Sequence, residues 1–87
     1  MHYLYILFSD SLDKFYVGSS HNPETSLTYH NNSNKGWTKR GRPWRLVFQQ
    51  GFPNRREAQK VERFVKTQKS TRFIQKVLSG EVELRND

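Results

Sequence analysis

Four side chains stand out as candidates for chemistry: Tyr5, Tyr16, His30 and Glu62. Histidine exchanges protons near neutral pH. A tyrosine with a pKa near 10 is a poor base unless nearby cations lower that pKa. His30 follows Ser26 by four residues, so on a helix the two side chains would share one face. Such groups could transfer protons close to a carboxylate. The alternatives are a buried strand tyrosine with a satisfied hydroxyl for Tyr5 and a cross-strand aromatic pair for Tyr16.

Glu62 lies at the edge of an apolar stripe that Ala58 and Val65 form on a predicted helix. A carboxylate in that place needs stabilising, and a bound Mg²⁺ or Mn²⁺ would do so because hard cations prefer carboxylate oxygen. One carboxylate suits a single metal ion that bridges the protein and a phosphate. The alternative is an exposed ion pair with Lys66, four residues further along.

Sequence signals for other common sites are missing. We find no glycine-rich phosphate loop and no His-x-Glu deaminase pattern. The three histidines, His2, His21 and His30, lack the spacing of a zinc site, and the chain has no cysteine. No Ser lies in a nucleophile-elbow motif, although counting residues does not exclude a Ser-His-Asp triad. The phenol, imidazole and carboxylate groups named above remain as the main candidates.

The positive charge is concentrated in one part of the chain. The net charge is +7, and 13 of the 15 Lys and Arg residues lie between Lys35 and Lys76. Such a field attracts polyanions. We predict nucleic acid, most simply DNA, as the partner, with a solubility charge as the alternative. A membrane surface is disfavoured, because no predicted helix pairs a basic face with a broad apolar one.

A basic segment with interspersed tryptophans could contact phosphates and stack bases. The candidate nucleic-acid-binding residues are Lys14, Lys35, Trp37, Lys39, Arg40 and Arg42. Lys14 and this segment could also lower the pKa of Tyr5. We expect Trp44, which follows the segment, in the core.

The strands and helices that must position these residues can be distinguished by their hydrophobic periodicity, which changes along the chain between that of a strand and that of a helix. The pattern predicts strands over 3–8, 15–18 and 44–50, and helices over 22–32, 54–69 and 70–79. Asn22, Asn54 and Ser70 are expected N-caps, and Gly80 ends the last helix. The order β-β-α-β-α-α predicts an α/β (α+β) fold with a small three-stranded antiparallel sheet flanked by helices.

A chain of 87 residues allows one domain. We place that domain at 1–80 and expect a frayed tail over 81–87. The N-terminus has no basic region, and the apolar run over 3–8 is too short for a signal peptide or a membrane span. A cytoplasmic location is therefore expected.

Several of these residues together resemble the GIY-YIG endonuclease superfamily, and in particular its small stand-alone bacterial members. Tyr3-Leu4-Tyr5 stands where that family has Gly-Ile-Tyr, and Tyr16-Val17-Gly18 where it has Tyr-Ile-Gly. His30 and Glu62 match the family's helical His and metal-binding Glu. The stretch 35–47 also looks like these bacterial members, so the resemblance covers residues 3 to about 79.

The resemblance implies a metal-dependent endonuclease that hydrolyses phosphodiester bonds in DNA with Mg²⁺ (or Mn²⁺) on Glu62. Tyr5 would deprotonate or orient the attacking water, and Tyr16 and His30 would assist. The family has an Arg at the position of Ser26. A serine hydroxyl cannot replace the planar, charged guanidinium group of that Arg, so the resemblance also implies impaired cleavage.

Two other functions fit the same residues. The first is a catalytically inactive nucleic-acid-binding module of the same fold, which Ser26 favours. The second is a protein-interaction domain whose basic surface is incidental. Affinity for DNA that falls steeply with salt would separate the first from the second.

Overall fold

The computed structural model describes residues 1–32 and 37–84, and of Trp37 and Thr38 it describes the backbone alone. The fold is a three-stranded antiparallel sheet with the strand order β2-β1-β3. The strands are β1 (His2–Ser9), β2 (Lys14–Ser20) and β3 (Trp44–Phe52). The predicted fold class is confirmed.

Strand β1 lies at the centre of the sheet and is covered on both faces. This is why its hydrophobic run is continuous rather than alternating. Leu4, Ile6 and Leu7 have no exposed surface. In its pairing with β3 the register shifts between Ile6 and Leu7. Strand β2 has only β1 as a neighbour, so its outer edge is open.

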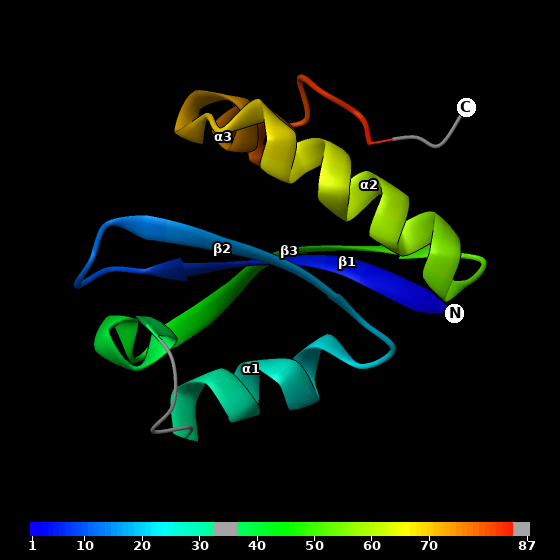
Figure 1. The fold of residues 1–87 in the computed structure, drawn as a ribbon. Coiled ribbons are helices and arrows are strands. Elements are labelled where there is room, and N and C mark those ends of the chain that lie inside the picture. The colour runs from blue at the N-terminus through cyan, green and yellow to red at the C-terminus, as the bar shows by residue number, and fades with distance from the viewer. Residues whose placement is uncertain (33–36, 85–87) are drawn as a thin grey trace.

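The helices cover the two faces of the sheet unequally (Figure 1). Helix α1 (Pro23–Asn32) lies on one face, and α2 (Arg55–Gln68) and α3 (Thr71–Ser79) lie on the other. A short 3₁₀ helix, η1 (Trp37–Gly41), precedes β3. The site residues on α1 and α2 therefore approach the sheet from opposite sides.

The helix ends follow from local sequence. The side chain of Asn54 accepts a hydrogen bond from the backbone N–H of Glu57 at 3.0 Å, and Ser70 accepts one from Phe73 at 3.1 Å. Each cap satisfies a backbone donor that the first helical turn leaves free. Gly80 ends α3 with φ of 86°, a conformation that glycine adopts without strain. The predicted caps at Asn54, Ser70 and Gly80 are confirmed.

Two cores form, one on each face of the sheet. The larger lies under α2 and α3 and includes Leu4, Ile6 and Val17. The smaller lies on the face of α1 and contains Tyr5, Leu7 and Trp44. Two of the candidate site residues thus belong to, or pack against, the smaller core: Tyr5 is a member and Tyr16 is packed on it.

The segment after Gly80 packs differently from the expected frayed tail. Leu84 is only 3% exposed and joins the larger core. The Gln50 side-chain amide donates to the Leu84 carbonyl at 2.8 Å. The expectation of fraying is therefore wrong as far as Leu84, because one buried leucine recovers enough apolar contact to order the chain. The domain boundary at residue 80 itself stays a prediction.

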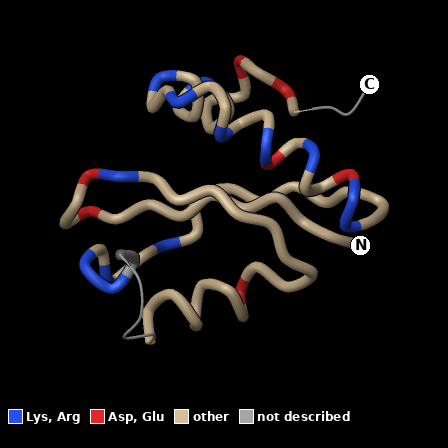
Figure 2. The backbone as a smooth tube through the Cα atoms, in the orientation of Figure 1, with Lys and Arg blue, Asp and Glu red and all other residues tan. Residues whose placement is uncertain are grey.

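The basic side chains are distributed unequally among the helices. Lys and Arg residues lie along α2 and α3 and near the start of β3, whereas α1 carries none (Figure 2). In the part of the chain that the structure describes, no helix has the length and hydropathy to cross a membrane.

Candidate active site

The pairing of β1 with β2 places Tyr5 and Tyr16 on one face of the sheet. Tyr5 lies opposite Gly18, and Leu7 lies opposite Tyr16, so the two tyrosines are diagonal neighbours. Their ring centroids are 6.3 Å apart and the rings are stacked. Strand alternation accounts for this common orientation.

Gly18 provides the space that the Tyr5 hydroxyl occupies. A Cβ atom at Gly18 would lie 2.6 Å from Tyr5 Oη and 2.7 Å from its Cζ. Both distances are shorter than real Cβ contacts. The glycine of the second motif is thus needed for its close approach to the first tyrosine.

Helix α1 brings His30 and Ser26 to the same hydroxyl. The Nε2 atom of His30 lies 3.4 Å from Tyr5 Oη, and the Ser26 side chain also hydrogen bonds with Tyr5. The His30 ring lies 4.5 Å from that of Tyr16, centroid to centroid. His30 is buried, and its Nδ1 has no hydrogen-bond partner among the described residues.

Glu62 reaches the open edge of β2 from the opposite face. Its Oε1 accepts a hydrogen bond from the Ser19 hydroxyl at 2.6 Å, and its Oε2 accepts one from Lys66 Nζ at 2.6 Å. Lys66 also lies over the Tyr16 ring, 6.0 Å from its centroid. Because β2 is an edge strand, groups from both faces meet around it.

The ion pair between Glu62 and Lys66 was the alternative that the sequence left open for Glu62, and the structure contains it. It does not exclude a metal role, because the Lys66 side chain is half exposed and can move away. Sequence reasoning missed Ser19. The signal was its position after Gly18, where strand alternation turns its side chain toward α2.

Burial dominates the electrostatics of the tyrosine and the histidine. Desolvation, with smaller effects from Tyr16 and Glu62, raises the pKa of Tyr5 to about 12, and the hydrogen bond with Ser26 opposes this rise. Burial lowers the pKa of His30. The decrease in the Tyr5 pKa expected from Lys14 and the basic segment is absent. At neutral pH both groups are uncharged, so Tyr5 donates and neutral imidazole can accept.

Glu62 fits a metal ion that relies on one protein carboxylate. No group of three or more His, Cys, Asp or Glu side chains that could hold a metal is present within residues 1–32 and 37–84. Glu62 instead lines an open hollow of about 310 Å³ with Gln59, Arg63 and Lys66. Mg²⁺ commonly keeps several waters and takes one or two carboxylates, so this donor set suits Mg²⁺ better than Zn²⁺.

The basic segment is only partly described. Lys35 and the side chain of Trp37 lie outside the described residues. Arg42 donates to the Lys39 carbonyl at 3.1 Å and to the Asn31 carbonyl at 3.4 Å. Lys14, Lys39, Arg40 and Arg42 are exposed, so they can meet phosphate groups.

Trp44 lies in the core, as expected, with 2% of its surface exposed. The Asn31 side chain holds its backbone, accepting from Trp44 N–H at 2.5 Å and donating to its carbonyl at 3.0 Å. This pair of hydrogen bonds ties the end of α1 to the start of β3. It therefore helps to position His30.

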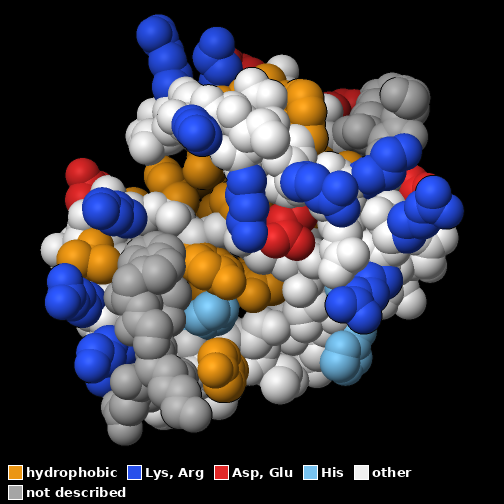
Figure 3. Space-filling view, viewed as in Figure 1, with side chains coloured by type: hydrophobic (Ala, Val, Ile, Leu, Met, Phe, Trp, Pro, Cys, Tyr) orange, Lys and Arg blue, Asp and Glu red, His pale blue; other side chains and the backbone are white. Residues whose placement is uncertain are grey.

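Lys and Arg side chains also form a band over α2, where an acidic side chain lies among them (Figure 3). Hydrophobic and histidine side chains are exposed directly below that band on the same face. The surface around the candidate site thus combines positive charge with apolar and aromatic area. That combination suits a nucleic acid strand.

Known proteins match this chain over nearly its whole length. The model of the GIY-YIG catalytic domain matches residues 1–76. UPF0213 protein CPE1444 of Clostridium perfringens is 33% identical over 87 residues, which cover 99% of this chain and 92% of that protein. No solved structure matches the chain significantly.

Two fungal proteins described as structure-specific endonuclease subunit slx1 also match. They come from Pyrenophora tritici-repentis and Phaeosphaeria nodorum and are 37% and 36% identical over 78 residues. Each match covers 83% of this chain but 21% of the relative. The chain therefore spans about a fifth of the length of these two relatives.

Proposed function

Because this chain belongs to the GIY-YIG family of nuclease domains, we propose that it is a metal-dependent endonuclease that hydrolyses phosphodiester bonds in DNA. One observation carries the proposal. Tyr5, Tyr16, His30 and Glu62, which come from four separate elements, meet around the open edge of β2. Such a meeting of proton-transferring groups and a carboxylate is what hydrolysis requires.

Glu62 is the proposed metal ligand, and Mg²⁺ (or Mn²⁺) the cofactor. When bound, such a cation neutralises charge on the phosphate and favours ionisation of water. Ser19 holds Oε1 of the carboxylate at 2.6 Å and so orients it toward the hollow beside Lys66. Lys66 must release Oε2 before a cation can bind there, and it is then free to contact a phosphate.

Tyr5 and His30 handle the proton in this scheme. With a pKa of about 12, Tyr5 is a phenol that orients the attacking water. As the water oxygen bonds to phosphorus, the proton passes from the water to Tyr5, and the leaving oxygen departs with the electron pair of its broken bond to phosphorus and takes a proton from solvent. Tyr5 in turn gives its own proton to His30 Nε2, 3.4 Å away. Burial lowers the pKa of His30, so its imidazole is neutral and a ring nitrogen has a lone pair for that proton.

Ser26 weakens the site. Its side chain lies against the Tyr5 hydroxyl, so this position on α1 is close enough for a longer cationic side chain to meet the phosphate. Serine provides no positive charge there. Loss of one such charge typically lowers the rate about a hundred- to a thousandfold. We propose that the chain retains the nuclease site with reduced activity.

The substrate is proposed to be DNA recognised by its structure. The two fungal relatives are described as structure-specific endonuclease subunits. A single small domain has little surface for reading bases, whereas exposed Lys14, Lys39, Arg40 and Arg42 can follow phosphates. A cytoplasmic location remains a prediction from the N-terminal sequence.

The test is cleavage of single-stranded, duplex and branched DNA of mixed sequence with Mg²⁺ or Mn²⁺. The chain is compared with Glu62→Ala, with Ser26→Arg, and with Glu57→Ala as a matched loss of charge on the same helix. We expect weak cleavage that Ser26→Arg increases, that Glu62→Ala abolishes and that Glu57→Ala leaves unchanged. Cleavage by Glu62→Ala at the original rate would contradict the proposal.

Ser26 also favours a second function, which is binding of nucleic acid without cleavage. It is supported if neither the chain nor Ser26→Arg cuts any substrate while both bind DNA with an affinity that falls steeply with salt.

A further inference from the structure

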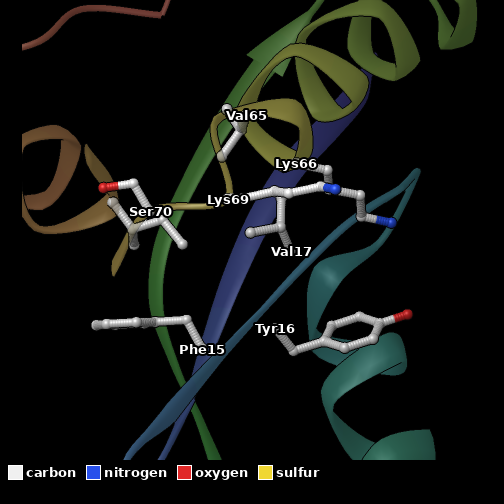
Figure 4. Close-up of a pocket in the computed structure, with 8 residues that line it drawn as sticks. Phe15, Tyr16, Val17, Val65, Lys66, Lys69 and Ser70 are labelled. Carbon is white, nitrogen blue, oxygen red and sulfur yellow. The ribbon is translucent and has the colours of Figure 1, made fainter. Parts of the chain in front are cut away.

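A second hollow adjoins the candidate active site, between the edge of β2 and the turn from α2 to α3 (Figure 4). Its volume is about 350 Å³. Apolar side chains of Phe15, Val17, Val65 and Ile74 line it. We call these four residues and the cavity that they line the apolar groove.

Two lysines lie at the rim of the apolar groove. Lys66 and Lys69 both line it and both are exposed, and each belongs to the last part of α2 or its cap. Strand alternation explains the floor, because Phe15 and Val17 point away from the α1 face that Tyr16 occupies. The apolar groove thus has an apolar floor and a positively charged rim along one side.

The apolar groove is continuous with the site through shared residues. Lys66 lines both this groove and the hollow of Glu62, and Tyr16 lines the groove as well. A strand with its phosphate between Glu62 and Tyr16 would extend its neighbouring nucleotide over the groove. A phosphate there would meet Lys66 and Lys69, and the attached base would meet apolar side chains.

We propose that the apolar groove binds the base of an unpaired nucleotide next to the phosphate that is cut. This inference rests on the proposed nuclease function and names its substrate class, which is DNA with an unpaired nucleotide at the cleavage position. A flat ring system can fill a groove of this size and leave its phosphate at the lysines. A base inside a duplex must first leave its stack, so the groove selects against fully paired DNA.

A larger hollow nearby shares Phe15 and has other apolar lining residues, but neither Lys66 nor Lys69 lines it. It measures about 520 Å³ and is lined by residues that include Asp13, Arg45 and Leu78. Arg45 is already paired with Asp10 at 3.1 Å, and the Asp13 carboxylate repels phosphate. Neither Tyr16 nor Glu62 lines this hollow. It therefore serves as a control surface.

The first experiment changes the DNA and leaves the protein intact. Binding without metal is measured for a branched oligonucleotide with one unpaired nucleotide at the branch, for the same strand with an abasic residue there, and for the fully paired duplex. Stacking of one base in the groove predicts about tenfold weaker binding of the abasic strand. Equal affinity for all three would overturn the proposal.

The second experiment locates the base. The unpaired nucleotide is replaced by the fluorescent base 2-aminopurine, and Ile74→Ser is compared with Leu78→Ser. Both residues are half-buried on α3, but only Ile74 lines the apolar groove and only Leu78 lines the control hollow. We expect Ile74→Ser alone to abolish the change in 2-aminopurine emission and the preference for the unpaired base. Equal behaviour of the two variants would refute the assignment.

Lys69→Asn provides a test that does not disturb the core. Lys69 has φ of 46°, which asparagine tolerates, so the variant removes charge and keeps the turn. Its affinity for the branched strand should depend less on salt, with the logarithmic slope reduced by about 0.7. Lys76→Asn, on the exposed side of α3, should leave the slope unchanged.

The outcomes separate this inference from the proposed function. If no substrate is cut but the unpaired base is still preferred, the nuclease function fails and the base groove stands. If duplex and branched DNA are cut equally fast, the nuclease stands and the groove assignment fails. If Ile74→Ser changes only self-association in sedimentation, the groove is an interface between copies, and the assignment also fails.

Discussion

Replacing Gly18 with alanine tests whether the close approach of the two tyrosine motifs is essential. The added Cβ would lie 2.6 Å from Tyr5 Oη, 2.7 Å from Tyr5 Cζ and 3.1 Å from Tyr16 Cε1. Tyr5 is 4% exposed and packs with Leu7 and Trp44, so its ring cannot swing aside. Either β2 or the Tyr5 ring must shift.

Overpacking of this kind typically costs about 1 to 3 kcal/mol. In a domain of this size that corresponds to a decrease in Tm of about 4 to 8 °C per kcal/mol. The effect on cleavage should be larger. A displacement of a reacting group by about 1 Å can lower the rate a hundredfold. We therefore expect Gly18→Ala to be folded, less stable and nearly inactive.

The control is Gly51→Ala, also in the sheet. There the new Cβ meets the side chain of Met1, which is 77% exposed and free to move, and lies 3.2 Å from Tyr3 Cε2, whose half-buried ring needs to shift only slightly. We expect its stability to stay within about 0.5 kcal/mol. Urea denaturation and DNA cleavage are measured for both variants. If Gly18→Ala is as stable and active as Gly51→Ala, the argument that Gly18 makes room for Tyr5 is wrong.

Three further predictions follow from burial. The folded protein keeps Tyr5 protonated up to about pH 12, whereas the unfolded chain ionises near pH 10. The contribution of neutral Tyr5 to the free energy of unfolding is therefore fully present below pH 10. Between pH 10 and 12 the free energy of unfolding decreases by about 2 to 3 kcal/mol. Tyr5→Phe should remove this loss in urea titrations, and an equal loss in both proteins would contradict the assigned cause. The pKa of His30 is lowered by burial, so the unfolded chain takes up a proton first as the pH falls below 6.5. Stability should decrease in that direction, and His30→Gln should flatten the decrease; a steeper curve for the variant would exclude His30 as its source. Leu84→Ala should cost about 2 to 5 kcal/mol in thermal or urea unfolding, because its side chain is buried in the larger core. A change below about 0.5 kcal/mol would mean that the segment after Gly80 is not part of the folded unit.

The local elements could be predicted because their causes are local. Asn54 and Ser70 cap the helices with hydrogen bonds to residues three positions later, and such spacings are visible in the sequence. Strand alternation, which is also a local rule, puts Tyr5 and Tyr16 on one face once the strands pair. The order of elements and the candidate tyrosines followed from patterns a few residues long.

Leu84 shows what such patterns miss. A single leucine in a polar segment carries no periodic signal. Its burial depends on the direction in which the chain continues after α3. The same holds for Ser19, which is an ordinary polar strand residue until α2 places Glu62 within 2.6 Å of it. Both contacts join residues far apart in the sequence, so local rules indicate at most the face on which Ser19 lies and not the partner that it meets there.

The sequence by itself determined the elements, the family and which side chains could do chemistry. Only the tertiary structure decided that β2 is an edge strand, with β1 as its one neighbour in the sheet. That edge lets His30 from one face and Glu62 from the other approach the same tyrosines, and it places the apolar groove beside them. The reason is physical. Side-chain type and periodicity act over a few residues, whereas strand order and the covering of an edge follow from how whole elements pack.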